Sequence, residues 1–98
     1  MLYYYMIKSF KDSESEKFYI TGKSKKLPPS IHKVALRKLD YINSAFVLDD
    51  LKVPPANRLE KLKGDLQDYY SIRINKQYRV IFKFNNGDAY DVSIVDYH

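Results

Sequence analysis

The chain has 98 residues and a mass of 11.6 kDa, so its length allows one domain and excludes a second, cofactor-binding fold. Its apolar content of 45% is typical of a folded protein, and the absence of cysteine excludes disulfides, thiolate catalysis and cysteine-based zinc sites. The net charge of +5 favours a polyanionic partner, although most of the surplus lies in residues 1–49.

The N-terminal quarter has the pattern of a strand followed by a short helix. Aromatic and β-branched residues from Tyr3 to Phe10 predict the strand. Ser13 and Glu16 have the spacing of a capping box, and Gly22 suits the C-terminal end of the helix. No signal peptide is recognisable, and no apolar run reaches the roughly 20 residues of a membrane span, so we expect a cytoplasmic protein without a membrane partner.

The most regular pattern predicts a helix of about four turns that begins after Pro28 and Pro29. Apolar residues recur there at spacings of three and four, which places them on one stripe of the helix. The stripe consists of Ile31, Ala35, Leu39, Ile42 and Phe46.

The second half of the chain changes to the alternation of half-buried antiparallel strands. Three segments alternate in this way, residues 70–74, 78–84 and 90–94, and a shorter strand is expected within Arg58–Lys63. These elements predict an α+β fold in which two N-terminal helices pack on one face of a small twisted antiparallel sheet.

The dipeptide Asn86-Gly87 predicts a hairpin between the last two strands. A two-residue loop would place Asp91 and Ser93 on the same face as Val80 and Phe82, so we expect a three-residue loop. That loop keeps the apolar residues on one face and sets a charge pair on the other: Phe84 with Tyr90, Phe82 with Val92, Val80 with Ile94, and Lys83 with Asp91.

The same reasoning sets Arg73 opposite Arg79 on the face without helices. Like charges at opposite positions destabilise a sheet by up to about 1 kcal/mol, and no acidic residue is expected beside both. Tyr97 lies one step diagonal to Arg79, with His98 at the edge of the face. This grouping indicates a site for the phosphate backbone of a nucleic acid. The alternative is that both arginines simply extend into water.

An ordered set of blocks runs from Met6 to the C-terminus. They are Met6-Ile7-Lys8-Ser9-Phe10, Asn57-Arg58-Leu59-Glu60-Lys61-Leu62-Lys63-Gly64-Asp65, Tyr69-Tyr70-Ser71-Ile72-Arg73-Ile74-Asn75, Tyr78-Arg79-Val80-Ile81-Phe82, Gly87-Asp88-Ala89-Tyr90 and Asp96-Tyr97-His98. The set resembles the HigB-type toxins of the RelE/ParE superfamily. The resemblance implies one RelE-like domain over residues 1–98, with residues 1–5 as an N-terminal extension.

The resemblance also implies an activity and partners. Such a toxin is a ribosome-dependent endoribonuclease that cleaves mRNA in the A site of the 30S subunit without a metal or cofactor. A HigA-type helix-turn-helix antitoxin neutralises it, and operator DNA is bound only through that antitoxin.

Family positions for catalysis fall on Lys63, Arg79, Asp96, Tyr97 and His98, and RNA contacts are expected from Arg58, Glu60, Lys61, Tyr70 and Arg73. The Arg79 fork suits a phosphate, with Lys63 as a second cation. His98 has an intrinsic pKa near 6.5, which suits either proton transfer, unless it is only a frayed terminus. Asp96 is expected to orient it or to act as the base, and Tyr97 to stack on a base or bind the phosphate.

Glu60 departs from the pattern, because one branch of the family has histidine at this position. Three readings stay open: Glu60 takes part of the role of that histidine, the position is dispensable, or Glu60 is a plain surface residue. Two other functions also stay open, a ParE-like toxin that poisons DNA gyrase and a non-catalytic RNA-binding module. Removal of Asp96–His98 separates these from catalysis, because only a nuclease requires the terminal residues.

Overall fold

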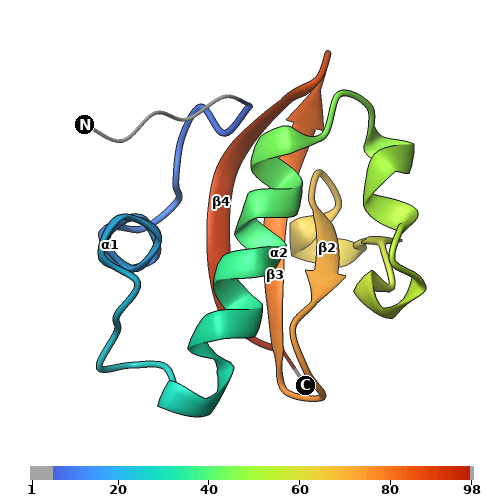
Figure 1. Ribbon diagram of the computed structural model, residues 1–98. Coiled ribbons are helices and arrows are strands. Elements are labelled where there is room, and N and C mark those ends of the chain that lie inside the picture. Colours follow the sequence, from blue (N-terminus) through green and yellow to red (C-terminus); the bar gives the residue numbers. More distant parts are fainter. Residues whose placement is uncertain (1–5, 98) are drawn as a thin grey trace.

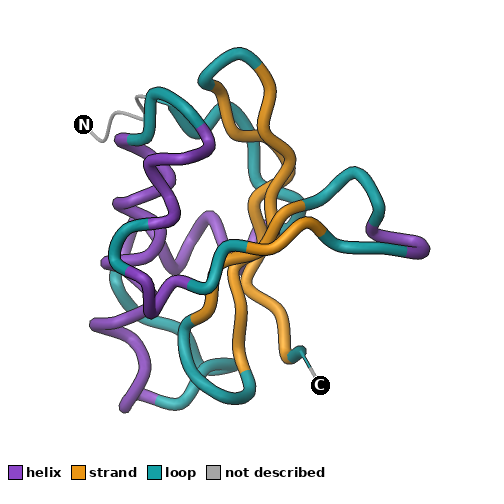
Figure 2. The backbone as a smooth tube through the Cα atoms, turned by 90° about the vertical axis from the view of Figure 1, so that its right-hand side faces the viewer, coloured by secondary structure: helices purple, strands orange, loops and turns teal. Residues whose placement is uncertain are grey.

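The computed structural model describes residues 6–97 and consists of helices on one side of a four-stranded antiparallel sheet (Figures 1 and 2). The helices are α1 (Ser13–Thr21) and α2 (His32–Ser44), and the strands are β1 (Glu60–Lys61), β2 (Tyr70–Arg73), β3 (Tyr78–Asn85) and β4 (Asp88–Asp96). Short 3-10 turns occupy Pro29–Ile31, Leu48–Lys52, Pro55–Asn57 and Gly64–Leu66. The strands lie in chain order across the sheet, and the predicted α+β architecture is confirmed.

Some predictions fall on residues outside this description, namely those for Met1–Tyr5 and His98. In the described part of the predicted first strand, the backbone forms only two parallel bridges to β4, Ile7 to Ala89 and Phe10 to Val92. Among residues 6–97, no helix has the length and apolar character needed to cross a membrane.

Helix α1 begins one residue earlier than the predicted capping box. Asp12, not Ser13, is the N-cap, and its carboxylate accepts a hydrogen bond from the backbone N–H of Ser15 at 2.9 Å. The prediction at Gly22 is confirmed, because this residue closes the helix in the left-handed conformation at φ 77°. Asp12 also accepts a hydrogen bond from the hydroxyl of Ser93 at 2.6 Å, which fixes the start of α1 to β4.

Helix α2 and the turn before it contribute an apolar stripe to the core, as the sequence predicts. Four stripe residues are buried against the sheet: Ile31, Ala35, Leu39 and Ile42. The prediction for Phe46 is wrong, because the helix ends at Ser44 and Ala45 has extended backbone angles. Phe46 thus leaves the helical stripe and is 72% exposed.

The pairing of β2 with β3 confirms the predicted register. Tyr70 lies opposite Phe82, Ile72 opposite Val80, and Arg73 opposite Arg79. Because side chains alternate between the two faces of a strand, Arg79 lies on the face that the helices leave uncovered.

The β3–β4 hairpin differs from the predicted one at its loop. Asn85 pairs with Asp88, so the loop has two residues, Asn86 and Gly87, both with positive φ. The extra residue that we placed in the loop is instead a β-bulge in β4, where Asp91 has φ 50°. The bulge moves the ladder by one residue on the loop side of Phe82, so the predicted pair of Phe84 with Tyr90 is wrong, and Phe84 pairs with Ala89. Phe82 lies at the bulge itself, and its pairing with Val92 stays a prediction. The pairs of Val80 with Ile94 and Arg79 with Val95 are correct. The predicted ion pair between Lys83 and Asp91 is also present, at 3.4 Å.

A second, smaller apolar cluster covers part of the face opposite the helices. The loop between β1 and β2 projects on this side of the sheet (Figure 2), and its residues Leu62 and Tyr69 pack on Ile81 of β3. Leu66, Val95 and Tyr97 lie against this cluster. The face opposite the helices is therefore partly covered by this cluster, and Arg79 lies on the same face beside Tyr97.

Candidate active site

Arg79 is the central charged group of the uncovered face. Its side chain is only 13% exposed. One terminal nitrogen, Nη1, donates to the hydroxyl of Ser71 at 2.9 Å, and the guanidinium carbon lies 5.3 Å from the centroid of the Tyr97 ring. Contacts from β2 and from the end of β4 thus fix the guanidinium group in place.

Glu60 provides the carboxylate that we did not expect. Its Oε1 atom lies 2.8 Å from Nη2 of Arg79, and its side chain is 49% exposed. The contact arises because β1 pairs Glu60 with Ser71, which places the carboxylate on the same face as Arg79. Glu60 is therefore an exposed residue whose carboxylate lies beside Arg79. Extending the register argument from β2 to the short strand β1 would have found this pair.

Arg73 does not join Arg79 in one phosphate clamp, although their backbones are paired. The Nε atom of Arg73 donates to the backbone carbonyl of Asn75 at 3.0 Å. Its side chain turns to the edge of β2 and lines an open pocket of about 390 Å³ with Arg37, Lys38 and Arg58. The two opposed arginines thus belong to two neighbouring sites.

Lys38 is the buried cation of this second site. It is only 5% exposed, and its Nζ atom donates to Oδ1 of Asn57 at 2.6 Å. Burial lowers the pKa of Lys38 below its ordinary value of 10.5, and the charge of Arg37 lowers it further. Lys38 lies off the apolar stripe of α2 and is buried because the 3-10 turn Pro55–Asn57 packs against it.

Tyr70 and Lys61 lie on the other face of the sheet from Arg79. Tyr70 packs against the main core, and the Nζ atom of Lys61 is 5.4 Å from the centroid of its ring. Tyr70 is one of the expected RNA contacts, whereas the register places it opposite buried Phe82. The structure therefore does not bring these two predicted RNA contacts to Arg79.

The remaining predicted catalytic residues differ in their relation to Arg79. Lys63 is exposed and caps the turn Gly64–Leu66, beyond the end of β1. Asp96 is exposed, accepts a hydrogen bond from Nε2 of Gln77 at 2.9 Å, and alternates away from the face of Tyr97. His98 lies outside the described residues. Among the five catalytic predictions, the direct contact is therefore between Arg79 and Tyr97.

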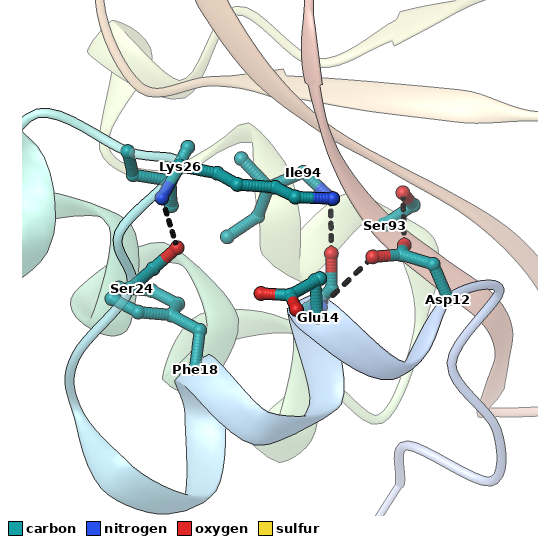
Figure 3. A pocket seen from close by; sticks show the side chains of 9 residues that line it. Asp12, Glu14, Phe18, Ser24, Lys26, Ser93 and Ile94 are labelled. Carbon is teal, nitrogen blue, oxygen red and sulfur yellow. Dashed lines mark hydrogen bonds between the residues drawn. The ribbon is translucent and has the colours of Figure 1, made fainter.

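A separate hollow lies between α1 and β4, on the helix side of the sheet (Figure 3). It has a volume of about 210 Å³, and its polar groups bond one another. The hydroxyl of Ser15 accepts from the backbone N–H of Ile94 at 3.0 Å, and Asp12 accepts from Ser93. We therefore assign this hollow to the attachment of α1 to the sheet.

Comparison with known proteins identifies the family. Residues 8–98 match the family model of the HigB-like toxins, described as RelE-like toxins of the type II toxin–antitoxin system HigB. Toxin HigB-1 of Vibrio cholerae is 45% identical over 86% of this chain and 90% of its own length. Endoribonuclease HigB of Proteus vulgaris is 33% identical over 95% of this chain and 100% of its own.

Solved structures agree with the fold. A mutant of YafQ from E. coli superposes with a TM-score of 0.58 at 14% identity, covering 92% of this chain and 90% of that one. The YoeB dimer from Staphylococcus aureus superposes with a TM-score of 0.55 at 20% identity, covering 98% and 99%. The fold is thus that of the RelE-like toxins, and an antitoxin is the partner that a toxin–antitoxin system supplies. The chain belongs to the HigB-like family of type II toxins.

Proposed function

We propose that this toxin is an endoribonuclease that cleaves mRNA on the ribosome without a metal ion. The observation that carries the proposal is the contact of Arg79 with the Glu60 carboxylate and the Tyr97 ring, on one accessible face. A relative that shares 33% of its residues over nearly the whole chain is named an endoribonuclease.

The pairing of Glu60 with Arg79 fits attack by a ribose 2′-hydroxyl on the adjacent phosphate. Arg79 binds the phosphate oxygens and stabilises the negative charge of the in-line phosphorane. Glu60, beside it, accepts the proton of the 2′-hydroxyl. The 2′-oxygen forms a bond to phosphorus while the bond to the 5′-oxygen breaks, which gives a 2′,3′-cyclic phosphate and a 5′-hydroxyl.

The departing 5′-oxygen needs a proton from an acid. We assign this role to His98, whose intrinsic pKa near 6.5 suits it, with Lys63 as a second cation. Tyr97 contacts Arg79 with its ring and offers a surface for a nucleobase. Asp96, which we expected to act as base or to orient His98, is bound by Gln77 instead, so the base role passes to Glu60.

The proposed setting is the cytoplasmic ribosome, with the mRNA in the A site of the 30S subunit. A single small domain has little surface with which to hold and orient RNA, so the ribosome supplies part of the positioning. The proposed antitoxin is a HigA-type helix-turn-helix protein, through which alone operator DNA is bound.

The test is cleavage of a defined mRNA in a translating extract. We expect Arg79→Ala to lower the cleavage rate by about 10²- to 10³-fold, because it removes the main donor to the phosphorane. Lys33→Gln, an exposed substitution on α2, serves as the control and keeps the wild-type rate. Circular dichroism and thermal melting check that Arg79→Ala is folded.

Three outcomes would contradict the proposal. Rescue by Mn²⁺ or Cd²⁺ of a slowed cleavage at a phosphorothioate placed at the scissile position would show that a metal ion is required. Intact mRNA together with inhibition of DNA gyrase would instead identify a ParE-like toxin. An RNA-binding module without catalysis would leave the mRNA intact and the gyrase active.

A further inference from the structure

The open pocket at the edge of β2 has a composition that the active site does not explain. Four cations line it, Arg37 and Lys38 from α2, Arg58 after the turn Pro55–Asn57, and Arg73 from β2, and no carboxylate of the described chain does. The pocket lies where β1 no longer covers β2, because β1 pairs only with Tyr70 and Ser71. Elements from both layers of the fold thus present positive charge to one hollow.

None of these charges is compensated by the described part of the protein. Within residues 6–97, none of the four cations forms an ion pair, whereas Arg79 has Glu60. Lys38 is buried, with the Asn57 amide oxygen and the Tyr41 ring as its partners. A buried ammonium beside a guanidinium costs electrostatic free energy, as the lowered pKa of Lys38 indicates. An anion in the pocket would relieve that cost.

The chemistry of the lining favours a phosphodiester. Three guanidinium groups offer forked donors that match pairs of phosphate oxygens, and two of these arginines are exposed at the rim. Arg58 connects the pocket to the active site, because its backbone carbonyl lies 3.5 Å from Nη1 of Arg79 while its side chain lines the pocket. One extended strand can therefore reach both places.

We propose that this pocket binds a backbone phosphate of the RNA strand that is cleaved at Arg79, at a nucleotide beside the scissile one. The inference rests on the proposed RNA substrate and adds α2, through Arg37, to the surface that holds it. The pocket acts in binding and not in the chemical step, so its loss weakens substrate binding while the rate at saturation is kept.

The experiment measures binding of a single-stranded 2′-O-methyl RNA, which retains its phosphates but has no 2′-hydroxyl to attack. We expect Arg37→Gln to weaken binding about tenfold and to reduce the slope of log K against log salt by about 0.7, the value of one phosphate contact on a single strand. The triple variant of Arg37, Arg58 and Arg73 to Gln reduces the slope by about 2. Lys33→Gln removes the same charge one turn earlier on α2 and leaves the slope unchanged.

Three results would overturn the inference. The first is a salt slope for Arg37→Gln equal to that of Lys33→Gln. The second is weaker binding to mRNA-free 30S subunits with unchanged binding to the oligonucleotide, which would assign the pocket to ribosomal RNA. The third is weaker binding of poly-L-glutamate without an effect on RNA, which would assign it to an acidic protein. The 2′-O-methyl RNA is not cleaved, so this experiment tests binding alone. The proposed nuclease activity is tested separately, in the translating extract.

Discussion

The two cationic sites on either side of β2 differ in how their charges are balanced. Arg79 has a carboxylate at 2.8 Å, a hydroxyl at 2.9 Å and an aromatic ring at 5.3 Å. The pocket at the edge of β2 gathers four cations, and none of them has an acidic partner within the described chain. An ion-paired guanidinium is held in one geometry, as a reaction requires. Cations without an acidic partner are instead suited to bind an anion such as a phosphate. The difference separates the proposed site of chemistry from the proposed site of binding.

The first prediction concerns the ion pair between Glu60 and Arg79. Glu60→Gln keeps an acceptor beside Arg79 but cannot take a proton, so we expect the cleavage rate to fall by about 10²- to 10⁴-fold. Binding of 2′-O-methyl RNA is expected to be retained or tightened, because a negative charge beside the phosphate site is removed. Single-turnover cleavage and anisotropy titrations measure the two effects.

A change of only a few-fold in rate would show that Glu60 merely positions Arg79 and that the base lies elsewhere. Glu60→His is the informative companion variant, because it restores the residue that one branch of the family has at this position. Recovery of cleavage in Glu60→His, with a rate that rises through the pKa range of histidine, would support a proton-transfer role.

The second prediction concerns Asn57, the residue that holds the buried Lys38 of the charged pocket in place. Asn57 is fully buried, accepts a hydrogen bond from Lys38 and donates to the carbonyls of Leu51 and Val53. Asn57→Ala removes these three hydrogen bonds and leaves Lys38 with the Tyr41 ring alone, so we expect a loss of about 3 kcal/mol in the free energy of unfolding. Urea denaturation measures the change. Asn85→Ala, at an exposed asparagine, is the control and is expected to change the free energy by less than about 0.5 kcal/mol. Equal effects of the two variants would contradict the structural role of Asn57.

The contrast between these sites also shows which features could be predicted from the sequence. The Arg79–Tyr97 contact followed from strand parity, because the faces of a strand are fixed by alternation and each pairing could be tested against the core. The ion pair of Glu60 with Arg79 was missed because the two residues of β1 are too few to display a period on their own, so the register argument stopped at β2. The predicted length of the hairpin loop was wrong because a one-residue bulge at Asp91 and a loop longer by one residue shift the strand pairing by the same amount.

The charged pocket could not be predicted in this way. Its cations come from α2, the turn after it and β2, and periodicity within one element does not show how separate elements meet. The helical pattern placed Lys38 off the apolar stripe, and only the packing of Pro55–Asn57 on α2 buries it. The family resemblance supplied the active-site positions, but it contained nothing about Arg37 or Lys38.

The smallest expected effect is the contribution of Lys38 to the pH dependence of the free energy of unfolding. Its pKa in the folded protein lies below the ordinary value of 10.5, because of burial and of the charge of Arg37, and Arg58 and Arg73 line the same pocket. Between the folded pKa and 10.5 the unfolded chain binds more protons, so stability rises with pH over that window. The free energy of unfolding of the wild type, minus that of Lys38→Gln, is therefore expected to increase as the pH rises toward 10.5. Taking this difference removes the contributions to stability that the two proteins share.

The same difference in free energy of unfolding, measured with bound RNA, tests whether the pocket holds a phosphate. A phosphate in the pocket favours the charged ammonium and moves the pKa of Lys38 back toward its ordinary value, so the difference should depend less on pH when the 2′-O-methyl RNA is present. A difference that falls as the pH rises, in the absence of RNA, would show that the folded protein stabilises the ammonium. A pH dependence that RNA leaves unchanged would place the bound phosphate away from Lys38. The buried lysine then reports directly on whether the unbalanced site, and not only Arg79, is occupied by the substrate.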